Sequence, residues 1–439
     1  MKVYSKILTG FLLSGLAASG WAQDATMEDV ERSFHPYDFE TPQTGALQPG
    51  VVVTQANVDE IAKDFLDEGM YQMVKDGWVE LTVGKLTSIP LNEKYIDATR
   101  INLNTATLGE QVGELNGYVA GRPFPTPPNL EDPRAGEKLA WNYRFSLHFG
   151  DSGAIGPFYW KYRDMESGKV EKTLKMEFNA YNWKHRTLEP PIPQVEDNPG
   201  DLFRTIYMRV DEPFDVKNTQ LLIHRYDNDL KRDNAWLYLG FQRRVRRLAS
   251  GQITDAFLGS DLMIEDFEGY NGRISDMQWT YKGVRWMLVP FYEHNEMVLG
   301  DEFKEDDGFQ YITFGGKGGC FPNITWQVRK QYLLEAKPVD SSHPVGHRDI
   351  FLDAQTFAFS RINIYDRGDK LWKMWFINQG PDYASMPANQ GRGVPVYDGF
   401  GMMDIQAMHC TTAQMRTEIH PERVTPKRFT PQYMRAVGK

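Results

Sequence analysis

Apolar and polar side chains alternate along most of the chain after residue 140, with the period of half-buried antiparallel strands. The alternation is clearest over residues 141–149, 158–163 and 170–181, and the polar turn at 166–169 predicts a hairpin between the last two. Further strands are predicted over residues 205–210, 221–226, 235–248, 277–281, 284–291, 327–336, 347–352, 357–365 and 371–377. Because no helical pattern separates these strands, they favour a meander of hairpins over a parallel α/β sheet.

Before this region, residues 55–75 show the period of an amphipathic helix, with Val58, Ile61 and Phe65 near one face. Asn57 is the expected N-cap, and Glu60, three residues later, is the expected partner in a capping box. The pattern therefore predicts one long helix in the N-terminal part of the chain.

Proline and glycine interrupt the pattern elsewhere. Residues 123–133 and 189–199 are rich in proline, which cannot donate to a sheet ladder, so both are expected to form surface loops. The tail after Gln379 is rich in Gly, Pro and Met. It predicts irregular chain, with a short helix marked by the methionines of residues 402–408.

The first residues have the features of an export signal. Lys2 and Lys6 give a positive start, residues 7–18 are apolar with small side chains, and residues 20–22 (Gly-Trp-Ala) resemble a small-x-small cleavage site. The sequence therefore predicts a signal peptide over residues 1–22, cleavage near Ala22, and a periplasmic protein. No later run approaches ~20 uninterrupted apolar residues, so no membrane helix is expected.

Length and composition narrow the class of protein. The 439 residues could form two domains, but β-rich folds often run longer, and a single domain over residues 23–439 is preferred. The net charge of −10 argues against a nucleic-acid binder, which usually has a basic surplus. An aromatic share of 13% suits a wide apolar interior or cavity, although an ordinary sheet core would use it too.

The chain has two cysteines, Cys320 and Cys410. In an oxidising compartment, an even pair favours one disulfide over two buried thiols. Such a bond would tie a Gly-rich loop to the C-terminal tail.

Four arginines, Arg243, Arg244, Arg246 and Arg247, form a dense basic cluster at the end of a predicted strand. They fit either a solvated strand end or a patch for a phosphate, a carboxylate or an acidic partner. The solvated strand end is the favoured interpretation, because charged clusters on strands usually face water.

Acidic residues follow the arginines at Asp261, Glu265 and Asp266. Paired carboxylates can perform acid–base chemistry or bind calcium, but no EF-hand pattern is present. Asp261 also suits the N-cap of a short helix over residues 262–267. Capping, or pairing with the arginine cluster, is therefore the favoured role.

Signatures of enzymes and cofactor sites are lacking in the sequence. There is no HExxH, no GxxxxGK[ST] and no GxSxG, and the Gly-rich run at 315–319 fits a flexible loop better than a phosphate site. His409 beside Cys410 is too small a set for a metal site. No metal and no cofactor are therefore expected.

The predicted strand at 370–377 is apolar on both faces, so both faces must be covered. A helix layer could cover one face, and a ligand could cover part of the other. An ordinary core is the alternative.

Two long segments resemble one family. Residues 243–267, RRVRRLASGQITDAFLGSDLMIEDF, resemble a signature in which a strand ending in R-R-x-x-R-L leads to G-S-D-(F/L)-x-x-E/D-D. Residues 348–374, RDIFLDAQTFAFSRINIYDRGDKLWKM, resemble its second hallmark, with a D-x-x-T turn, a strand ending in Y-D, a Gly turn and L-W-K. Residues 227–229 (Asp-Asn-Asp) and 235–239 fit as well. The chain thus resembles exported proteobacterial proteins that carry the domain of unknown function 1329. At the level of fold it resembles the periplasmic lipoprotein carrier and the outer-membrane lipoprotein receptor.

This resemblance implies a mainly β fold with some α: a curved antiparallel sheet forming an unclosed β-barrel, with helices on the concave side and an apolar cavity for acyl chains. The chain is longer than a lipoprotein carrier, with N- and C-terminal extensions, so another hydrophobic cargo fits as well as a lipoprotein. The expected cavity residues are Trp236, Tyr238, Phe241, Trp279, Trp286, Leu288, Phe357, Phe359, Trp372 and Trp375. The expected signature loop is Gly259, Ser260, Asp261 and Asp266, and the four arginines are expected to contact a headgroup or a partner.

The expected function is that of a non-enzymatic periplasmic carrier or adaptor for a lipid or acylated cargo, acting between an inner-membrane exporter and an outer-membrane protein. One alternative is an exported hydrolase or lipid-modifying enzyme that uses Asp261, Asp266 or a histidine. Another is an envelope assembly factor that binds no ligand.

Overall fold

The computed structural model describes residues 24–198, 200–249, 253–382 and 386–438. The predicted signal peptide, residues 1–22, lies outside the described residues.

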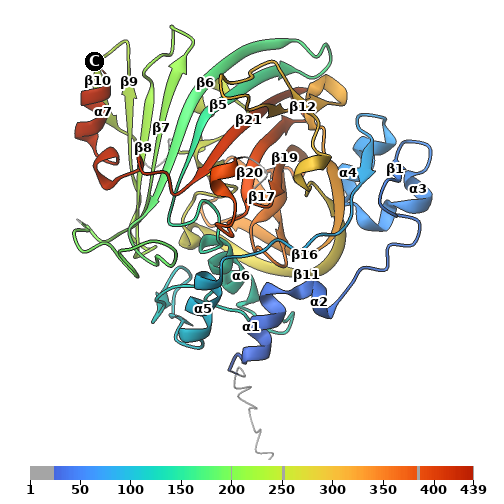
Figure 1. Ribbon diagram of the computed structural model, residues 1–439, viewed down its shortest axis with the longest axis horizontal. Coiled ribbons are helices and arrows are strands. Elements are labelled where there is room, and N and C mark those ends of the chain that lie inside the picture. The colour runs from blue at the N-terminus through green and yellow to red at the C-terminus, as the bar shows by residue number, and fades with distance from the viewer. Residues whose placement is uncertain (1–23, 199, 250–252, 383–385, 439) are drawn as a thin grey trace, which may run out of the picture.

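One large sheet dominates the molecule (Figure 1). Its spatial order is β1 (Val52–Val53), β2 (Leu81–Val83), β16 (Thr325–Pro338), β17 (Val345–Asp353), β18 (Phe359–Asp366), β19 (Leu371–Gly380), β20 (Val396–Asp404), β21 (His409–Ile419), β5 (Ser152–Asp164), β6 (Val170–Asn182), β7 (Leu202–Glu212), β8 (Gln220–Tyr226), β9 (Asn234–Leu239) and β10 (Arg244–Arg247). β11 (Met277–Val289) pairs with β16 beside this path. Apart from the parallel β2–β16 pair, these strands pair in antiparallel fashion, as the hairpin pattern predicts.

The sheet curves strongly but does not close into a barrel. Within the described chain, β10 pairs only with β9, so the sheet keeps an open edge there. Register shifts interrupt the β5–β6, β6–β7, β17–β18, β18–β19 and β19–β20 pairs. Each shift bends the strands and increases the local twist, which gives the sheet a concave face. The predicted unclosed β-barrel architecture is confirmed.

The concave face holds the main apolar core. Residues at alternate positions of β5–β8 and β16–β21 point into it, for example Phe158 and Trp160 on β5 and Trp375 and Ile377 on β19. Helix α6 (Ala135–Arg144) packs into this core close to β11 and β16 (Figure 1). The chain at 256–279 fills much of the remaining space.

Two further cores cover the outer surfaces of the sheet. Residues Met374, Phe376 and Met403 alternate with the concave residues and join a second core with the N-terminal helices. These helices are α1 (Met27–Phe34), α2 (Pro36–Phe39), α3 (Val58–Ile61), α4 (Glu68–Lys75) and α5 (Glu93–Ile101). The C-terminal helix α7 (Pro431–Val437) covers the outer face of β7–β9, at the left of Figure 1.

Three two-stranded pairs lie outside the large sheet: β3 (Thr107–Leu108) with β4 (Leu115–Asn116), β12 (Leu299–Gly300) with β13 (Tyr311–Ile312), and β14 (Phe314–Gly315) with β15 (Phe321–Pro322). The predicted disulfide between Cys320 and Cys410 is present, and it ties the start of β15 to β21. In the part of the chain that the structure describes, no helix has the length and apolar character needed to span a membrane.

Several local predictions are wrong. The strand predicted over 235–248 is a hairpin of β9 and β10, and the strands predicted over 277–281 and 284–291 are one strand, β11. Residues 141–149 form no strand, since 141–144 belong to α6 and 145–149 to the turns after it. Almost every side of α6 is buried, so it lacks the polar face that would mark it as a helix. The helix predicted over 55–75 is broken into α3, a 3₁₀ turn and α4, and Asn57 accepts from the Thr54 N–H without capping α3. The tail predicted as irregular contains the long strands β20 and β21.

The glycines of β20 explain the last error. A side chain at Gly399 would press on the Ala413 carbonyl oxygen, and one at Gly401 on the Cys320 carbonyl oxygen. These glycines allow close approach of neighbouring backbone within a strand, although in the sequence they look like loop residues.

Candidate functional site: an apolar chamber and its plug

The concave face of the sheet forms an apolar chamber that is almost full. Its remaining cavity has a volume of about 50 Å³. The walls are Phe149, Ile155, Phe158, Trp160, Phe178, Met208, Leu262, Phe267, Glu268, Trp375, Ile377, Tyr397, Phe400 and Met415. A space of this size holds a few water molecules but not an acyl chain. The described residues therefore leave no hollow of the size expected for cargo on the concave face of the sheet.

The chamber is filled by a segment that does not belong to the sheet. Residues 256–270, here called the plug, consist of short turns that include η3 (Phe257–Gly259) and η4 (Ile264–Asp266). The Phe257 and Phe267 rings contact each other at 5.3 Å between centroids, and both pack edge-on against Trp160 at 6.0 and 6.3 Å. The plug thus occupies the chamber with side chains of the kind that a hydrophobic ligand would offer.

Polar contacts hold the plug at three places. The first is Asp261, whose carboxylate accepts from the Thr411 hydroxyl at 2.7 Å and contacts His409 Nδ1 at 2.9 Å, both on β21. The hydrogen bond with Asp261 raises the pKa of His409, which favours the imidazolium and strengthens the pair. Lys373 on β19 donates to the Asp261 carbonyl oxygen at 2.5 Å.

The second contact is a buried cluster around Arg348 of β17. Its guanidinium pairs with Glu265, and with Asp266 at 3.2 Å, while His343 lies 3.0 Å from Glu265. Burial alone would raise the pKa of Glu265, but the charges of Arg348 and His343 lower it below its usual value. Burial raises the pKa of Asp266. This cluster fixes the middle of the plug.

The third contact is Glu268, which pairs with Arg204 of β7 and lies 3.7 Å from His148. Burial opposes ionisation, yet Arg204 and His148 lower the pKa of Glu268 to about 2. The Tyr143 hydroxyl of α6 donates to the Glu268 carbonyl oxygen at 2.6 Å and accepts from the Tyr270 N–H at 2.8 Å. The plug is thereby tied to α6 as well as to the sheet.

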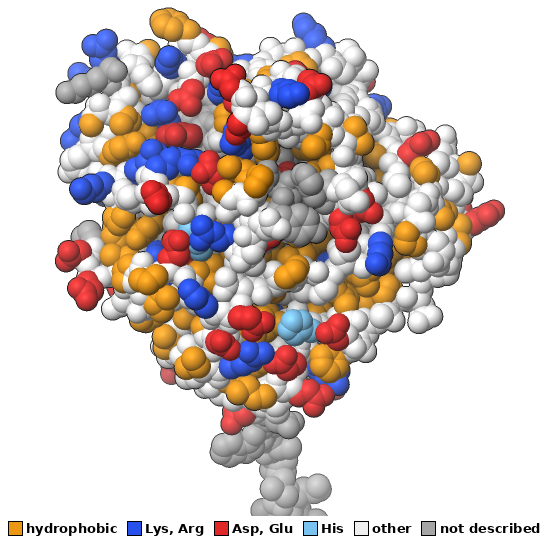
Figure 2. Space-filling model, in the orientation of Figure 1, with side chains coloured by type: hydrophobic (Ala, Val, Ile, Leu, Met, Phe, Trp, Pro, Cys, Tyr) orange, Lys and Arg blue, Asp and Glu red, His pale blue; other side chains and the backbone are white. Residues whose placement is uncertain are grey.

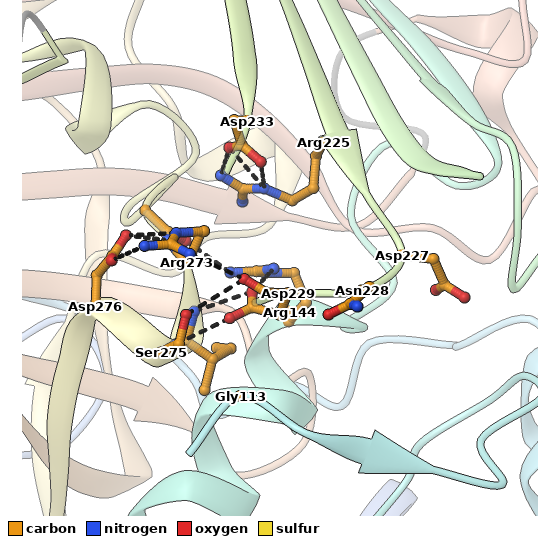
Figure 3. A network of polar contacts seen from close by, with 12 residues as sticks. Gly113, Arg144, Arg225, Asp227, Asn228, Asp229, Asp233, Arg273, Ser275 and Asp276 are labelled. Atoms are coloured by element: carbon orange, nitrogen blue, oxygen red, sulfur yellow. Dashed lines mark hydrogen bonds and ion pairs between the residues drawn. The ribbon is translucent and has the colours of Figure 1, made fainter. Parts of the chain in front are cut away.

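Beyond the plug, Asp229 anchors the chain that leads into β11 (Figure 3). Its carboxylate accepts from Arg144 at 3.1 Å and from the backbone N–H groups of Ile274 at 3.1 Å and Ser275 at 2.9 Å. Arg144 is the last residue of α6. Asp229 therefore joins α6, the β8–β9 turn and the chain after the plug.

The neighbouring Asp227 points away from this cluster in Figure 3. It contacts Lys184 at 2.7 Å and His185 at 2.6 Å. Burial works against its charge, but these two partners lower the pKa of Asp227 to about 2. The Asp-Asn-Asp motif thus supplies two separate structural ion pairs.

The structure does not bring the ten expected cavity residues together. Five belong to the concave core or pack against it: Trp279, Phe357, Phe359, Trp372 and Trp375. Two pack on the outer face under α7 (Trp236 and Tyr238), two belong to the second core (Trp286 and Leu288), and Phe241 is exposed. The prediction for the two β9 residues is wrong because the sequence does not show which face of a strand becomes concave.

The signature loop and the arginines are also separated. Gly259, Ser260, Asp261 and Asp266 all lie in the plug, where Asp261 pairs with His409 and Asp266 with Arg348. Asp261 neither pairs with the arginine cluster nor caps a helix over 262–267, where η4 spans only residues 264–266. Arg243, Arg244, Arg246 and Arg247 are exposed at the sheet edge.

Sequence reasoning missed the partners of the plug. Arg348, Arg204 and Lys373 each lie beside an apolar run of their strand, and each side chain is buried. A cation within an apolar strand indicates a buried anion nearby, and this signal was available in the sequence.

Two other features of the described chain resemble sites. Glu335, His347 and Asp349 place their ligand atoms within 4.8 Å of one another, but Glu335 pairs with Lys282 and His347 stacks on Tyr365. A second hollow of about 550 Å³ has walls that include Leu299, Phe309 and Arg416. Its walls also include Asp307, Gln310 and Asp398, so it suits an acyl chain less well than the apolar chamber does.

Fold and site together define a class of protein: a curved, unclosed sheet whose apolar interior is occupied by a segment of its own chain. The chain belongs to the family described as protein of unknown function (DUF1329), whose model matches residues 52–435.

Comparison with known proteins gives distant relatives. An uncharacterised protein of Pseudomonas aeruginosa is 24% identical over 358 residues, which is 77% of this chain and 72% of the relative. A solved domain from Vibrio parahaemolyticus, named for outer-membrane lipoprotein sorting, shows 17% identity and a TM-score of 0.47, covering 69% of this chain and 100% of its own. A DUF1329 protein from Desulfovibrio piger shows 15% identity and a TM-score of 0.47, covering 69% and 98%.

Proposed function

We propose that this protein is a non-enzymatic periplasmic carrier or adaptor for a hydrophobic ligand that contains an acyl chain. The observation that carries the proposal is the apolar chamber whose occupant is a segment outside the sheet, held there by side-chain contacts. In this proposal the plug fills the chamber when no cargo is bound, and the cargo enters when the plug moves out.

Exchange of the plug for a ligand in the chamber is close to balanced in free energy. Moving the buried Phe257, Leu262, Met263, Ile264 and Phe267 into water costs about 1.5–3 kcal/mol for each side chain, whereas a ligand gains about 0.8 kcal/mol for each buried methylene. A chain of roughly ten to twenty methylenes therefore replaces what the plug loses. Such a balance suits a carrier, which has to release its cargo as well as bind it.

The chamber also has unsatisfied hydrogen-bond donors. The indole N–H groups of Trp141, Trp160 and Trp375 are buried in the concave core, and none of them has a partner among the described residues. A buried donor without a partner costs about 1–3 kcal/mol. An ester or carboxylate oxygen of a ligand would remove that cost, so the proposed cargo is an acyl ester or a fatty acid rather than a plain hydrocarbon.

The proposal places the protein between an inner-membrane exporter and an outer-membrane protein, with the predicted signal peptide as its route of export. An acid–base role for Asp261 receives little support. Its carboxylate is engaged by Thr411 and His409, and the other ring nitrogen of His409 lies 3.5 Å from Glu171, so both imidazole nitrogens face carboxylates.

Native mass spectrometry of the protein purified from its own periplasm tests the proposal, together with uptake of a fluorescent fatty acid. We expect co-purified lipid or, for empty protein, slow uptake. Asp261→Asn removes one charge-assisted contact of the plug, worth about 1.5–3 kcal/mol, and should speed uptake roughly ten- to hundredfold. Asp227→Asn, which removes partly buried ion pairs away from the plug, is the matched control and should leave the rate unchanged.

Other outcomes would point elsewhere. A lipid-free protein that takes up no fatty acid in any variant would contradict the carrier and favour the assembly factor. Ester hydrolysis that is lost in Asp261→Asn would favour the enzyme.

A further inference from the structure

Two exposed phenylalanines lie at one corner of the molecule. Phe214 is in the β7–β8 turn and is 93% exposed, and Phe241 is in the β9–β10 turn and is 77% exposed. The next most exposed phenylalanine of the described chain is Phe39, at 43%. Large apolar side chains with so much exposure, on two neighbouring turns, indicate a surface that contacts something apolar.

The two turns form one unit. A side chain at Gly240 would collide with the Lys217 carbonyl oxygen, so the turns pack directly against each other. Both lie at the upper left of Figure 1, beside the C-terminus, since Tyr238 at the end of β9 donates to the Gly438 carbonyl oxygen. We call residues 213–218 and 240–247 the hairpin corner.

The hairpin corner is basic, although the whole chain carries a net charge of −10. Arg243, Arg244 and Arg246 are exposed and bond through their backbone within the β9–β10 hairpin, but none of their side chains forms a hydrogen bond or ion pair with the residues that the structure describes. Arg247 donates to Asn234, and the exposed acid of the corner, Asp215, pairs with Lys172 at 3.3 Å. Figure 2 shows Lys and Arg side chains gathered on this side of the molecule.

The backbone at Arg243 adds a second observation. Its φ is +52°, a left-handed conformation in which glycine or asparagine is usual and a long side chain is uncommon. Glycine would relieve that strain, so an arginine held there points to a use for its side chain.

We propose that the hairpin corner docks the protein on an anionic phospholipid bilayer, with Phe214 and Phe241 entering the interface and the arginines meeting the headgroups. Aromatic rings suit the boundary between headgroups and acyl chains, and cations beside them are attracted to anionic lipid. A bilayer is favoured over a protein because the apolar contact consists of two isolated, highly exposed rings on turns, with the exposed cations Arg243, Arg244 and Arg246 directly after Phe241 in the chain. The inference goes beyond cargo binding and does not depend on it.

Binding of the purified protein to cargo-free vesicles tests the docking. Vesicles of phosphatidylcholine alone are compared with vesicles containing 3:7 phosphatidylglycerol to phosphatidylcholine, about 30% anionic lipid, by flotation at low and high salt. We expect binding to the anionic vesicles alone, and weakening as salt rises, because screening reduces attraction between exposed charges.

Two variants with matched controls locate the surface. Phe214→Ser with Phe241→Ser should weaken binding about 100-fold, roughly tenfold for each ring. Its control is Ile101→Ser with Leu130→Ser, which removes two other exposed apolar side chains. Arg243→Gln with Arg244→Gln and Arg246→Gln should also weaken binding about 100-fold, against a control triple of Lys85→Gln, Arg367→Gln and Lys370→Gln.

An inserted probe gives a direct readout. Both native cysteines form the disulfide, so a cysteine introduced by Phe214→Cys can be labelled with an environment-sensitive dye. The emission of the dye should shift to the blue on anionic vesicles. The emission of the same dye on the control variant Ile101→Cys should not shift. Equal binding of the corner variants and the wild type would overturn the proposal. So would an absence of vesicle binding, even if the corner then cross-linked to a protein.

Discussion

Phe267→Ala tests whether the plug occupies the site in which a ligand would bind. Phe267 is 5% exposed, contacts Phe257 and Trp160, and lines the remaining cavity. Removing a buried phenylalanine ring costs about 3–5 kcal/mol. For a chain of roughly 400 residues the entropy of unfolding is about 0.8–0.9 kcal/mol/K, so the melting temperature should fall by about 4–6 °C.

The decisive measurement compares the stability of the variant with and without ligand. The lost ring enlarges the chamber next to the existing cavity, so dodecanoate should bind the variant more tightly than the wild type and recover part of the lost stability. Ligand at about 100 times its dissociation constant would return about 2.7 kcal/mol, or roughly 3 °C. Thermal melts with and without dodecanoate, together with calorimetric titration, measure both quantities.

Phe376→Ala is the matched control, because Phe376 is equally buried but belongs to the second core on the outer face. It should lose similar stability and recover none with dodecanoate. Equal rescue of both variants, or no rescue of Phe267→Ala, would refute the placement of the ligand in the chamber.

Three further outcomes are expected. The pKa of Glu268 is about 2 against an ordinary 4.5, which contributes about 3 kcal/mol to the free energy of unfolding at neutral pH. This contribution is present above about pH 5 and is lost as pH falls towards 2. In urea unfolding, the wild type should therefore lose more stability between pH 6 and pH 3 than Glu268→Gln does. Replacing both Cys320 and Cys410 with serine opens a loop of 90 residues and should cost about 2–4 kcal/mol in denaturant unfolding, with no change if the bond does not form in the native protein. Trp375→Phe removes an unsatisfied indole donor, so it should lower affinity for dodecanoate more than affinity for dodecane, and an equal loss for both ligands would exclude the indole as a contact.

The sheet could be predicted because its strands are half-buried hairpins. The pair at β5 and β6 shows the period of two over long stretches, with Phe158, Trp160 and Tyr162 on one face. Helix α6 could not be predicted in this way. Trp141 and Tyr143 lie in a helix that is buried on nearly every side, so its sequence carries no amphipathic signal and mimics strand alternation.

The candidate site could be predicted from the sequence only in part, for a different reason. In the sequence, Asp261 and Asp266 follow the arginine cluster closely, and this spacing favours ion pairs between the acids and the arginines. In the fold the acids turn into the chamber and meet His409 and Arg348, which lie over 80 residues further along the chain. Long-range pairing of this kind depends on which strands become neighbours, and local pattern does not specify that.

The composition of the plug suggests how it can be both ordered and removable. Apolar side chains alone would hold it in the chamber through burial, with no reason to leave for anything but a better-packed ligand. The signature instead alternates apolar residues such as Leu262 and Phe267 with acids that meet buried cations. A buried ion pair fixes geometry, but the cost of removing its charges from water cancels much of its attraction.

The plug contacts therefore specify one closed position at a modest net gain in stability. When the plug leaves, the arginine and histidine partners become solvated, which returns the desolvation cost. A permanent core would gain more from apolar residues in place of Asp261, Glu265 and Asp266. Their presence in the signature fits a segment that closes the chamber reproducibly and opens it again.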